Sequence, residues 1–188
     1  TVLAVGPVTN VATAIRSSPQ TAERLKEVVS MGGNVSAADV AHTQCWSDLN
    51  YGSDEASAGV FLESIDRLTV ISIQVSERFY ISPNRYERLL TQTRYGDYFE
   101  ETTRFWYWLR SRAFVAWDMV ALACLVHPEW FSDRMVKIDY TPSMNGPRLK
   151  PGTATDGGYV VNIPTYRGDA DGFVEDVRGE ENSLYSQG

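Results

Sequence analysis

The chain has 188 residues, 43% hydrophobic and 22% charged, which is the composition of a globular domain rather than of a disordered or fibrous protein. A net charge of −7 argues against binding to nucleic acid or to an anionic membrane surface, because both need a basic surface. No apolar run reaches the roughly 18 residues that cross a bilayer. Two cysteines, Cys45 and Cys124, are too few for a disulfide scaffold. We therefore expect two reduced thiols and favour a cytoplasmic protein.

The first part of the chain alternates short apolar runs with helical patterns and turn residues. In chain order we predict a strand over 1–5, helices over 8–15 and 19–25, a buried strand over 26–31, a helix over 54–64 with Ala56, Val60 and Phe61 inward, and a strand over 68–75. Gly6-Pro7 and Gly32-Gly33 end the first two strands. This strand–helix–strand order predicts an α/β fold with a mostly parallel sheet and flanking helices. Residues 34–50 show no regular period, and such a segment is often functional.

The second part of the chain is rich in helical and aromatic patterns. In chain order we predict helices over 82–114 divided at Gly96-Asp97, a helix over 115–126, a strand over 135–140, a loop over 142–158, a strand over 159–164 and a helix over 170–177. The aromatic run Phe105–Trp108 is interpreted as core, although one of its faces could cover a ligand. The last residues are polar and are expected to fray.

Two of the predicted turns carry groups that could bind a ligand or a metal ion. Ligands of parallel sheets bind at the carboxyl ends of the strands, and the turn over residues 5–10 lies at such an end, where a backbone carbonyl could serve a hard metal. Asp48 and Asn50 follow the irregular segment, and a carboxylate and an amide two residues apart suit hydrogen bonds to neighbouring hydroxyls. The alternatives are a plain strand–helix turn at Val5 and a turn or helix cap at Asp48.

A third feature is the dipeptide Trp117-Asp118 at the start of an apolar helical pattern. Asp118 could be the N-terminal charge that the helix dipole favours. It could instead coordinate a metal, with the flat indole of Trp117 offered to a base or a sugar.

Taken together, these blocks resemble the C-terminal part of the nucleoside hydrolases, the nucleoside N-ribohydrolases. The resemblance is carried, in the family's order and rough spacing, by residues 3–12, 28–33, 48–56 and 116–118. Trp117-Asp118 resembles the purine-preferring, inosine-adenosine-guanosine branch, whereas the inosine-uridine branch usually has His-Asp. The resemblance implies a Rossmann-like α/β fold that is incomplete at the N-terminus. It also implies that residues 1–178 are part of one domain, followed by a polar tail over 179–188.

The activity implied by the resemblance is calcium-dependent hydrolysis of the N-glycosidic bond of ribonucleosides, with a leaning towards purines. By matching positions, Asp118 is a calcium ligand, and Val5 offers its main-chain carbonyl to the same ion. Trp117 is the position that stacks on the leaving base.

Three further residues match positions that the family uses for ribose. Asp48 and Asn50 correspond to a Glu-x-Asn motif, and Asp39 falls closest to an asparagine of the preceding loop. The family's N-terminal aspartate cluster, which holds the remaining calcium ligands and the general base, has no counterpart in this chain. The resemblance therefore implies that the general base lies outside these residues.

The chain is compatible with functions of different classes. It could be part of an active hydrolase whose aspartate cluster lies on a further N-terminal segment or on a companion chain. It could instead be an inactive relative that binds a nucleoside or a sugar, or that serves in an assembly through exposed aromatics. Because an incomplete sheet exposes apolar surface, we also expect a homo-oligomer or a partner.

Overall fold

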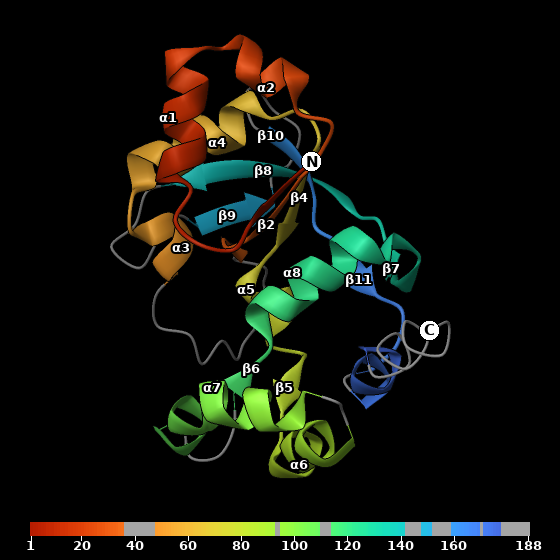
Figure 1. The fold of residues 1–188 in the computed structure, drawn as a ribbon. Coiled ribbons are helices and arrows are strands. Elements are labelled where there is room, and N and C mark those ends of the chain that lie inside the picture. Colours follow the sequence, from red (N-terminus) through yellow and green to blue (C-terminus); the bar gives the residue numbers. More distant parts are fainter. Residues whose placement is uncertain are drawn as a thin grey trace, which may run out of the picture. The chain divides into compact units, whose positions relative to one another are not determined.

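Figure 1 shows the chain as a computed structural model, which describes residues 1–35, 48–92, 95–109, 114–141, 148–151, 159–169 and 171–177. The backbone contacts divide the chain into two compact units. The first comprises residues 1–76 and 117–166, and the second comprises residues 77–116 and 167–188. Asp39, Cys45 and the predicted tail over 179–188 lie outside the described residues.

A mixed sheet forms the centre of the first unit. Its strands, in spatial order, are β1 (Val2–Ala4), β2 (Val28–Met31), β4 (Leu68–Ile71), β10 (Tyr159–Asn162), β8 (Met135–Thr141), β9 (Arg148–Pro151) and β3 (Asn34–Val35). The pairs from β1 to β10 are parallel, β8 is antiparallel to both of its neighbours, and β3 is parallel to β9. A short second pair joins β7 (Phe131–Ser132) to β11 (Thr165–Tyr166). The predicted α/β class with a mostly parallel sheet is confirmed.

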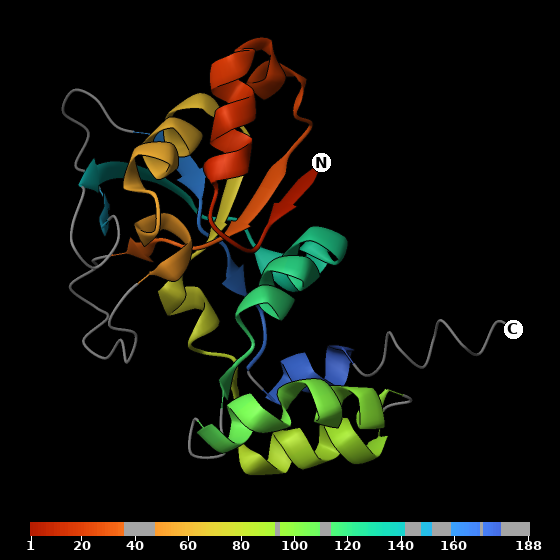
Figure 2. The same cartoon turned by 60° about the vertical axis from the view of Figure 1, so that its left-hand side comes forward.

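Helices cover the two faces of the parallel strands. The helices of the first unit are α1 (Thr9–Ser17), α2 (Gln20–Arg24), α3 (Leu49–Gly52), α4 (Glu55–Ser64), α5 (Ile73–Ser76), α8 (Trp117–Val126) and the single turn η1 (Pro128–Trp130), of which α1, α4 and α8 pack on the parallel strands. Figure 2 shows α1 and α4 on one side of the strands and α8 on the other. Asp54 caps α4 by accepting the amide of Ser57, and it also accepts the hydroxyl of Thr9 at 2.8 Å, which ties α4 to α1.

The alternation of side chains along the strands explains the two layers. Val28, Leu68 and Val70 belong to the main hydrophobic cluster with α1 and α4. The residues between them, such as Val29 and Met31, point to the opposite face, where α8 contacts β2. An apolar helix such as α8 suits this position because it buries Val120, Ala121, Ala123 and Cys124.

The second unit is mainly helical. It contains β5 (Tyr80–Ile81), α6 (Pro83–Gln92), α7 (Gly96–Leu109) and β6 (Phe114–Val115), and residues 171–177 are helical as well. β5 and β6 form an antiparallel pair. Arg85 and Arg88 of α6 share Asp171 Oδ1 at 2.8 Å each, which joins the last helix to α6. Within the described residues of both units, no helix is long and apolar enough to span a membrane.

Several predicted details of the fold are wrong. The strand predicted over 68–75 stops at Ile71, because the hydroxyl of Ser72 accepts the amide of Val75 and starts α5. Ala56 is exposed rather than inward, since the buried face of α4 is formed by its neighbours Ser57 and Ala58. The loop predicted over 142–158 contains β9, which two partner strands hold in place.

The interpretation of the whole run Phe105–Trp108 as core is also wrong. Tyr107 stacks on Tyr86 of α6 with ring centroids 3.9 Å apart. Phe105, Trp106 and Trp108 are between 56% and 70% exposed, because four consecutive residues span every side of a helix.

Candidate active site at the carboxyl ends of the strands

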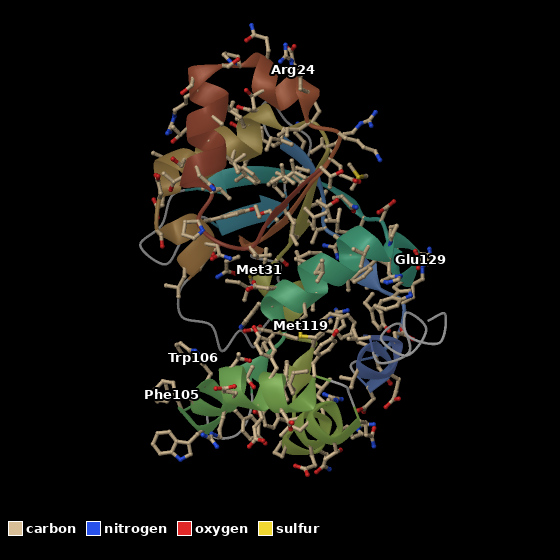
Figure 3. All side chains as sticks on the ribbon, in the orientation of Figure 1. Arg24, Met31, Phe105, Trp106, Met119 and Glu129 are labelled. Atoms are coloured by element: carbon tan, nitrogen blue, oxygen red, sulfur yellow. The ribbon has the colours of Figure 1, made fainter. Side chains whose placement is uncertain are left out.

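The candidate residues of the first unit gather around strand ends and one helix start. Val5 directly follows β1, and Gly32-Gly33 directly follow β2, its parallel neighbour, so both lie at the same edge of the sheet. Asp48 and Asn50 begin α3. Trp117 and Asp118 begin α8, which packs against both β1 and β2. Figure 3 labels Met31 at the end of β2 and Met119 in the first turn of α8.

Asp48 is held by backbone amides on both of its oxygens. Oδ2 accepts the N–H of Gly33 at 2.6 Å, and Oδ1 accepts the N–H groups of Asn50 and Tyr51 at 3.0 and 3.1 Å. The side chain is only 4% exposed, and this burial raises its pKa, while the three amide bonds act in the opposite direction. The carboxylate therefore caps α3 and fastens it to the end of β2. Its contact with ribose stays a prediction.

Asn50 lies in the first turn of α3 and is half-buried. Its Nδ2 donates to the main-chain carbonyl of Met31 at 2.9 Å and approaches the sulfur of the same residue at 3.2 Å. These bonds fix the amide over the carboxyl end of β2. The side-chain carbonyl of Asn50 is the acceptor that this arrangement offers to a hydroxyl, and its use by ribose also stays a prediction.

A buried tyrosine supports this corner of the sheet. The hydroxyl of Tyr51 donates to Ser30 Oγ at 3.0 Å beneath β2, and burial raises the pKa of the phenol. Its ring fills the space beside Gly32, whose φ of +151° favours glycine. A Cβ at Gly32 would come within 2.8 Å of two ring carbons of Tyr51. The resemblance included Ser30, Met31, Gly32 and Tyr51 within its matching blocks, but the sequence alone did not predict that these residues support the site.

Trp117 and Asp118 are the first two residues of α8, and they differ in exposure. Trp117 is half-buried, whereas Asp118 is exposed. Partial desolvation raises the pKa of the Asp118 carboxyl. An exposed acid in the first turn of a helix is consistent both with the dipole and with a ligand position, so the two alternatives for Asp118 stay open.

The described residues alone do not fit a calcium site. Calcium takes six to eight oxygen ligands, whereas Asp118 and the carbonyl of Val5, the two positions predicted to bind it, would supply three at most. In the ranges that the structure describes, no three His, Cys, Asp or Glu side chains are placed so that they could hold a metal ion together. Any calcium site that uses Asp118 must therefore receive further ligands from elsewhere.

Comparison with known proteins identifies the class to which this arrangement belongs. The fold is similar to the crystal structure of an inosine-uridine preferring nucleoside hydrolase from Bacillus anthracis, with a TM-score of 0.72 and 19% identity over 93% of this chain and 58% of the other. It is also similar to a purine-preferring ribonucleoside hydrolase from Gardnerella vaginalis, with a TM-score of 0.69 and 20% identity over 94% of this chain and 58% of the other. The α/β fold is thus that of nucleoside hydrolases.

The sequence matches assign the family. The family described as inosine-uridine preferring nucleoside hydrolase matches residues 1–176, and the chain belongs to this family. A probable uridine nucleosidase of rice, Oryza sativa subsp. japonica, is 28% identical over 137 residues, which cover 70% of this chain and 42% of the rice protein. The match thus spans less than half the length of this curated relative. The predicted family resemblance is confirmed.

Proposed function

We propose that this chain forms part of a calcium-dependent hydrolase that cleaves the N-glycosidic bond of ribonucleosides, with a preference for purine bases. The observation that carries the proposal is the family match over residues 1–176. In the reaction, water bonds to C1′ of the ribose, the bond from C1′ to the base breaks, and the base leaves with the electron pair and a proton.

The chain's own residues contribute binding and electrostatics to this reaction. Positive charge develops on the ribosyl group as the base departs, and a carboxylate placed nearby, such as Asp118, stabilises it. Asn50 accepts a ribose hydroxyl with Oδ1, while Asp48 holds the start of α3 in position. Asp39, which the resemblance matches to a ribose contact, is a further candidate for binding the sugar. Trp117 stacks on the leaving base. Calcium, when bound, supplies a nucleophilic water and a template for the ribose hydroxyls.

The remaining calcium ligands and the general base come from residues beyond this chain, on a further segment or a companion chain. This part of the proposal rests on the family resemblance, because the N-terminal aspartate cluster of the family has no counterpart in this sequence. The chain alone should therefore bind calcium weakly and release no base, whereas the intact polypeptide or complex that contains it should do both.

The test is hydrolysis of inosine by that intact polypeptide or complex, with calcium removed by a chelator and then restored. We expect activity to vanish and return with calcium, and Asp118→Asn to reduce it at least about 100-fold, because even indirect supports of a metal cost 10–100-fold. Asp66→Asn is the matched control, since Asp66 is an exposed acid just before β4, at the amino end of that strand and away from the carboxyl ends. If the intact polypeptide or complex is folded but releases no base when calcium is present, the proposed activity is refuted. That result would favour an inactive relative that binds a nucleoside.

The base preference has its own test. The names of the three relatives refer to uridine, to inosine and uridine, and to purines, so the preference for purines rests on Trp117. Stacking of one base on an aromatic ring is worth about 1–3 kcal/mol. Trp117→Leu should therefore lower kcat/KM for inosine about 5- to 100-fold and lower that for uridine less, whereas Trp130→Leu should change neither. Equal losses for the two substrates would remove Trp117 from base selection.

A further inference from the structure

Two hydrogen bonds tie the start of α3 to the end of β2 in the first unit. Asp48 Oδ2 accepts the amide of Gly33 at 2.6 Å. Two residues further along α3 and two residues back along β2, Asn50 Nδ2 donates to the carbonyl of Met31 at 2.9 Å. Figure 3 labels Met31, the residue at which the second bond ends. Because both bonds join the same two segments, the position of Asn50 depends on the bond that Asp48 makes.

The carboxylate of Asp48 has little capacity left for a ligand. A carboxylate offers about four lone pairs, and three of those of Asp48 accept the backbone N–H groups of Gly33, Asn50 and Tyr51. The residue is only 4% exposed. The family motif that resembles this segment has a glutamate here, whose side chain is one methylene longer. The shorter side chain of Asp48 binds backbone groups of its own fold, where a sugar hydroxyl would have to displace an amide.

The side-chain amide of Asn50 is fixed in one orientation. Its Nδ2 lies 2.9 Å from the carbonyl oxygen of Met31 and 3.2 Å from the sulfur of the same residue, so its two hydrogens have two acceptors. Turning the amide over would place Oδ1 against that carbonyl oxygen, and two acceptors with no hydrogen between them repel each other. Asn50 is half-buried, unlike Asp48. Its Oδ1 is therefore an acceptor of fixed direction for a hydroxyl that donates.

We propose that Asp48 is a positioning residue, which orients Asn50 for the sugar and makes no contact of its own with it. The inference rests on the proposed function for the identity of the ligand, a ribonucleoside. The coupling of Asp48 to Asn50 is a property of the fold and needs no ligand. Recognition of the sugar at this corner then depends on one neutral acceptor, Asn50 Oδ1, rather than on a carboxylate and an amide together.

The first experiment follows the side-chain N–H protons of Asn50 in this chain by ¹H–¹⁵N nuclear magnetic resonance. Asp48→Ser keeps a residue type that caps α3, but its side chain is too short to accept the amide of Gly33 as well. We expect both protons to exchange with solvent about 10-fold faster in Asp48→Ser than in the wild type. Asp54→Ser is the matched control, because Asp54 caps α4 in the same way, and it should leave this exchange unchanged. Unchanged exchange in a folded Asp48→Ser variant would overturn the proposal.

The second experiment is a double-mutant cycle on inosine hydrolysis by the intact polypeptide or complex that contains this chain. Asp48→Ser and Asn50→Ala should each raise KM about 2- to 10-fold with kcat nearly unchanged, as expected when a contact made equally in the ground and transition states is lost. A fold that is merely destabilised would instead lower kcat through loss of active enzyme. If Asp48 acts only through Asn50, the double variant has the KM of Asn50→Ala. Additive losses would show that Asp48 binds the sugar itself.

Asp48→Glu separates the two roles by direction. It restores the residue of the family motif, so a sugar-binding role predicts a KM equal to or below that of the wild type. The positioning role predicts a higher KM, because a longer side chain does not fit the closed site of Asp48. Circular dichroism shows whether each variant is folded, and the cycle with Asp48→Ser decides if Asp48→Glu is not. A wild type that releases no base refutes the proposed function, and the exchange of the Asn50 protons then decides this proposal alone.

Discussion

Replacing Gly32 with alanine should destabilise the first unit strongly, because the new methyl group has no space. The added Cβ would lie 2.8 Å from Cδ1 and Cε1 of Tyr51 and 3.3 Å from Cζ. The ring of Tyr51 cannot move away, because it is fully buried and its hydroxyl donates a hydrogen bond to Ser30. Overpacking a core costs about 1–3 kcal/mol, and a non-glycine residue at an unfavourable positive φ costs about 1–3 kcal/mol more. We expect Gly32→Ala to lower the free energy of unfolding by about 2–6 kcal/mol.

Urea unfolding followed by circular dichroism measures this loss. Gly6→Ala is the matched control, because a Cβ at Gly6 meets no atom within 4 Å, and it should change the free energy of unfolding by less than about 0.5 kcal/mol. In a Tyr51→Leu background the ring is absent, so the cost of Gly32→Ala should fall to the backbone part alone. Equal midpoints for Gly32→Ala and Gly6→Ala would refute the steric reasoning, as would a cost that Tyr51→Leu leaves unchanged.

Three further predictions concern hydrogen bonds and pH. Tyr51→Phe leaves Ser30 buried without its donor and should cost about 1–2 kcal/mol in urea unfolding, part of which an added Ser30→Ala recovers. Asp48→Asn loses an acceptor for backbone amides and should lower the free energy of unfolding by about 1–3 kcal/mol. Because burial raises the folded-state pKa of Asp48, the wild type loses stability as pH rises from about 4 through that pKa, and the difference between the two proteins should shrink. Arg85 lowers the pKa of Asp171 to about 2, so the stability that Asp171 contributes is present above about pH 4 and is lost as pH falls towards 2; Asp171→Asn should lack this loss in unfolding measured across that range.

The fold of the first unit could be predicted largely from local patterns. Short apolar runs bounded by glycine and proline marked β1 and β2, and the helices between the strands followed a 3.6-residue period. The end of β4 could not be predicted, because Ile73 and Val75 continue a β-branched pattern and only the hydroxyl of Ser72 turns the chain into a helix. β9 was missed because its four residues are too few to show a period and its parallel pairing with β3 joins positions more than 100 residues apart.

The candidate site was predicted residue by residue from its resemblance, but the supports of that site were not. Asp48 and Asn50 stood out as polar groups after an irregular segment, whereas the hydrogen bond from Asn50 to Met31 depends on the end of β2 lying beside α3. The space that Gly32 leaves for Tyr51 depends on backbone geometry as well. Such contacts join residues about 20 positions apart, and the sequence does not show that these residues lie next to each other in the fold.

The bond between Gly33 and Asp48 also makes the segment between them easy to exchange. Since Asp48 Oδ2 accepts the amide of Gly33 at 2.6 Å, the two residues that flank the segment 34–47 are held together directly, whatever sequence joins them. Halving the length of a flexible connection changes its closure entropy by only about 0.6 kcal/mol. Residues 36–47 are therefore a natural place to graft a shorter linker or a foreign peptide. Such a replacement removes Asp39 while it leaves Asp48 and Asn50 in their places.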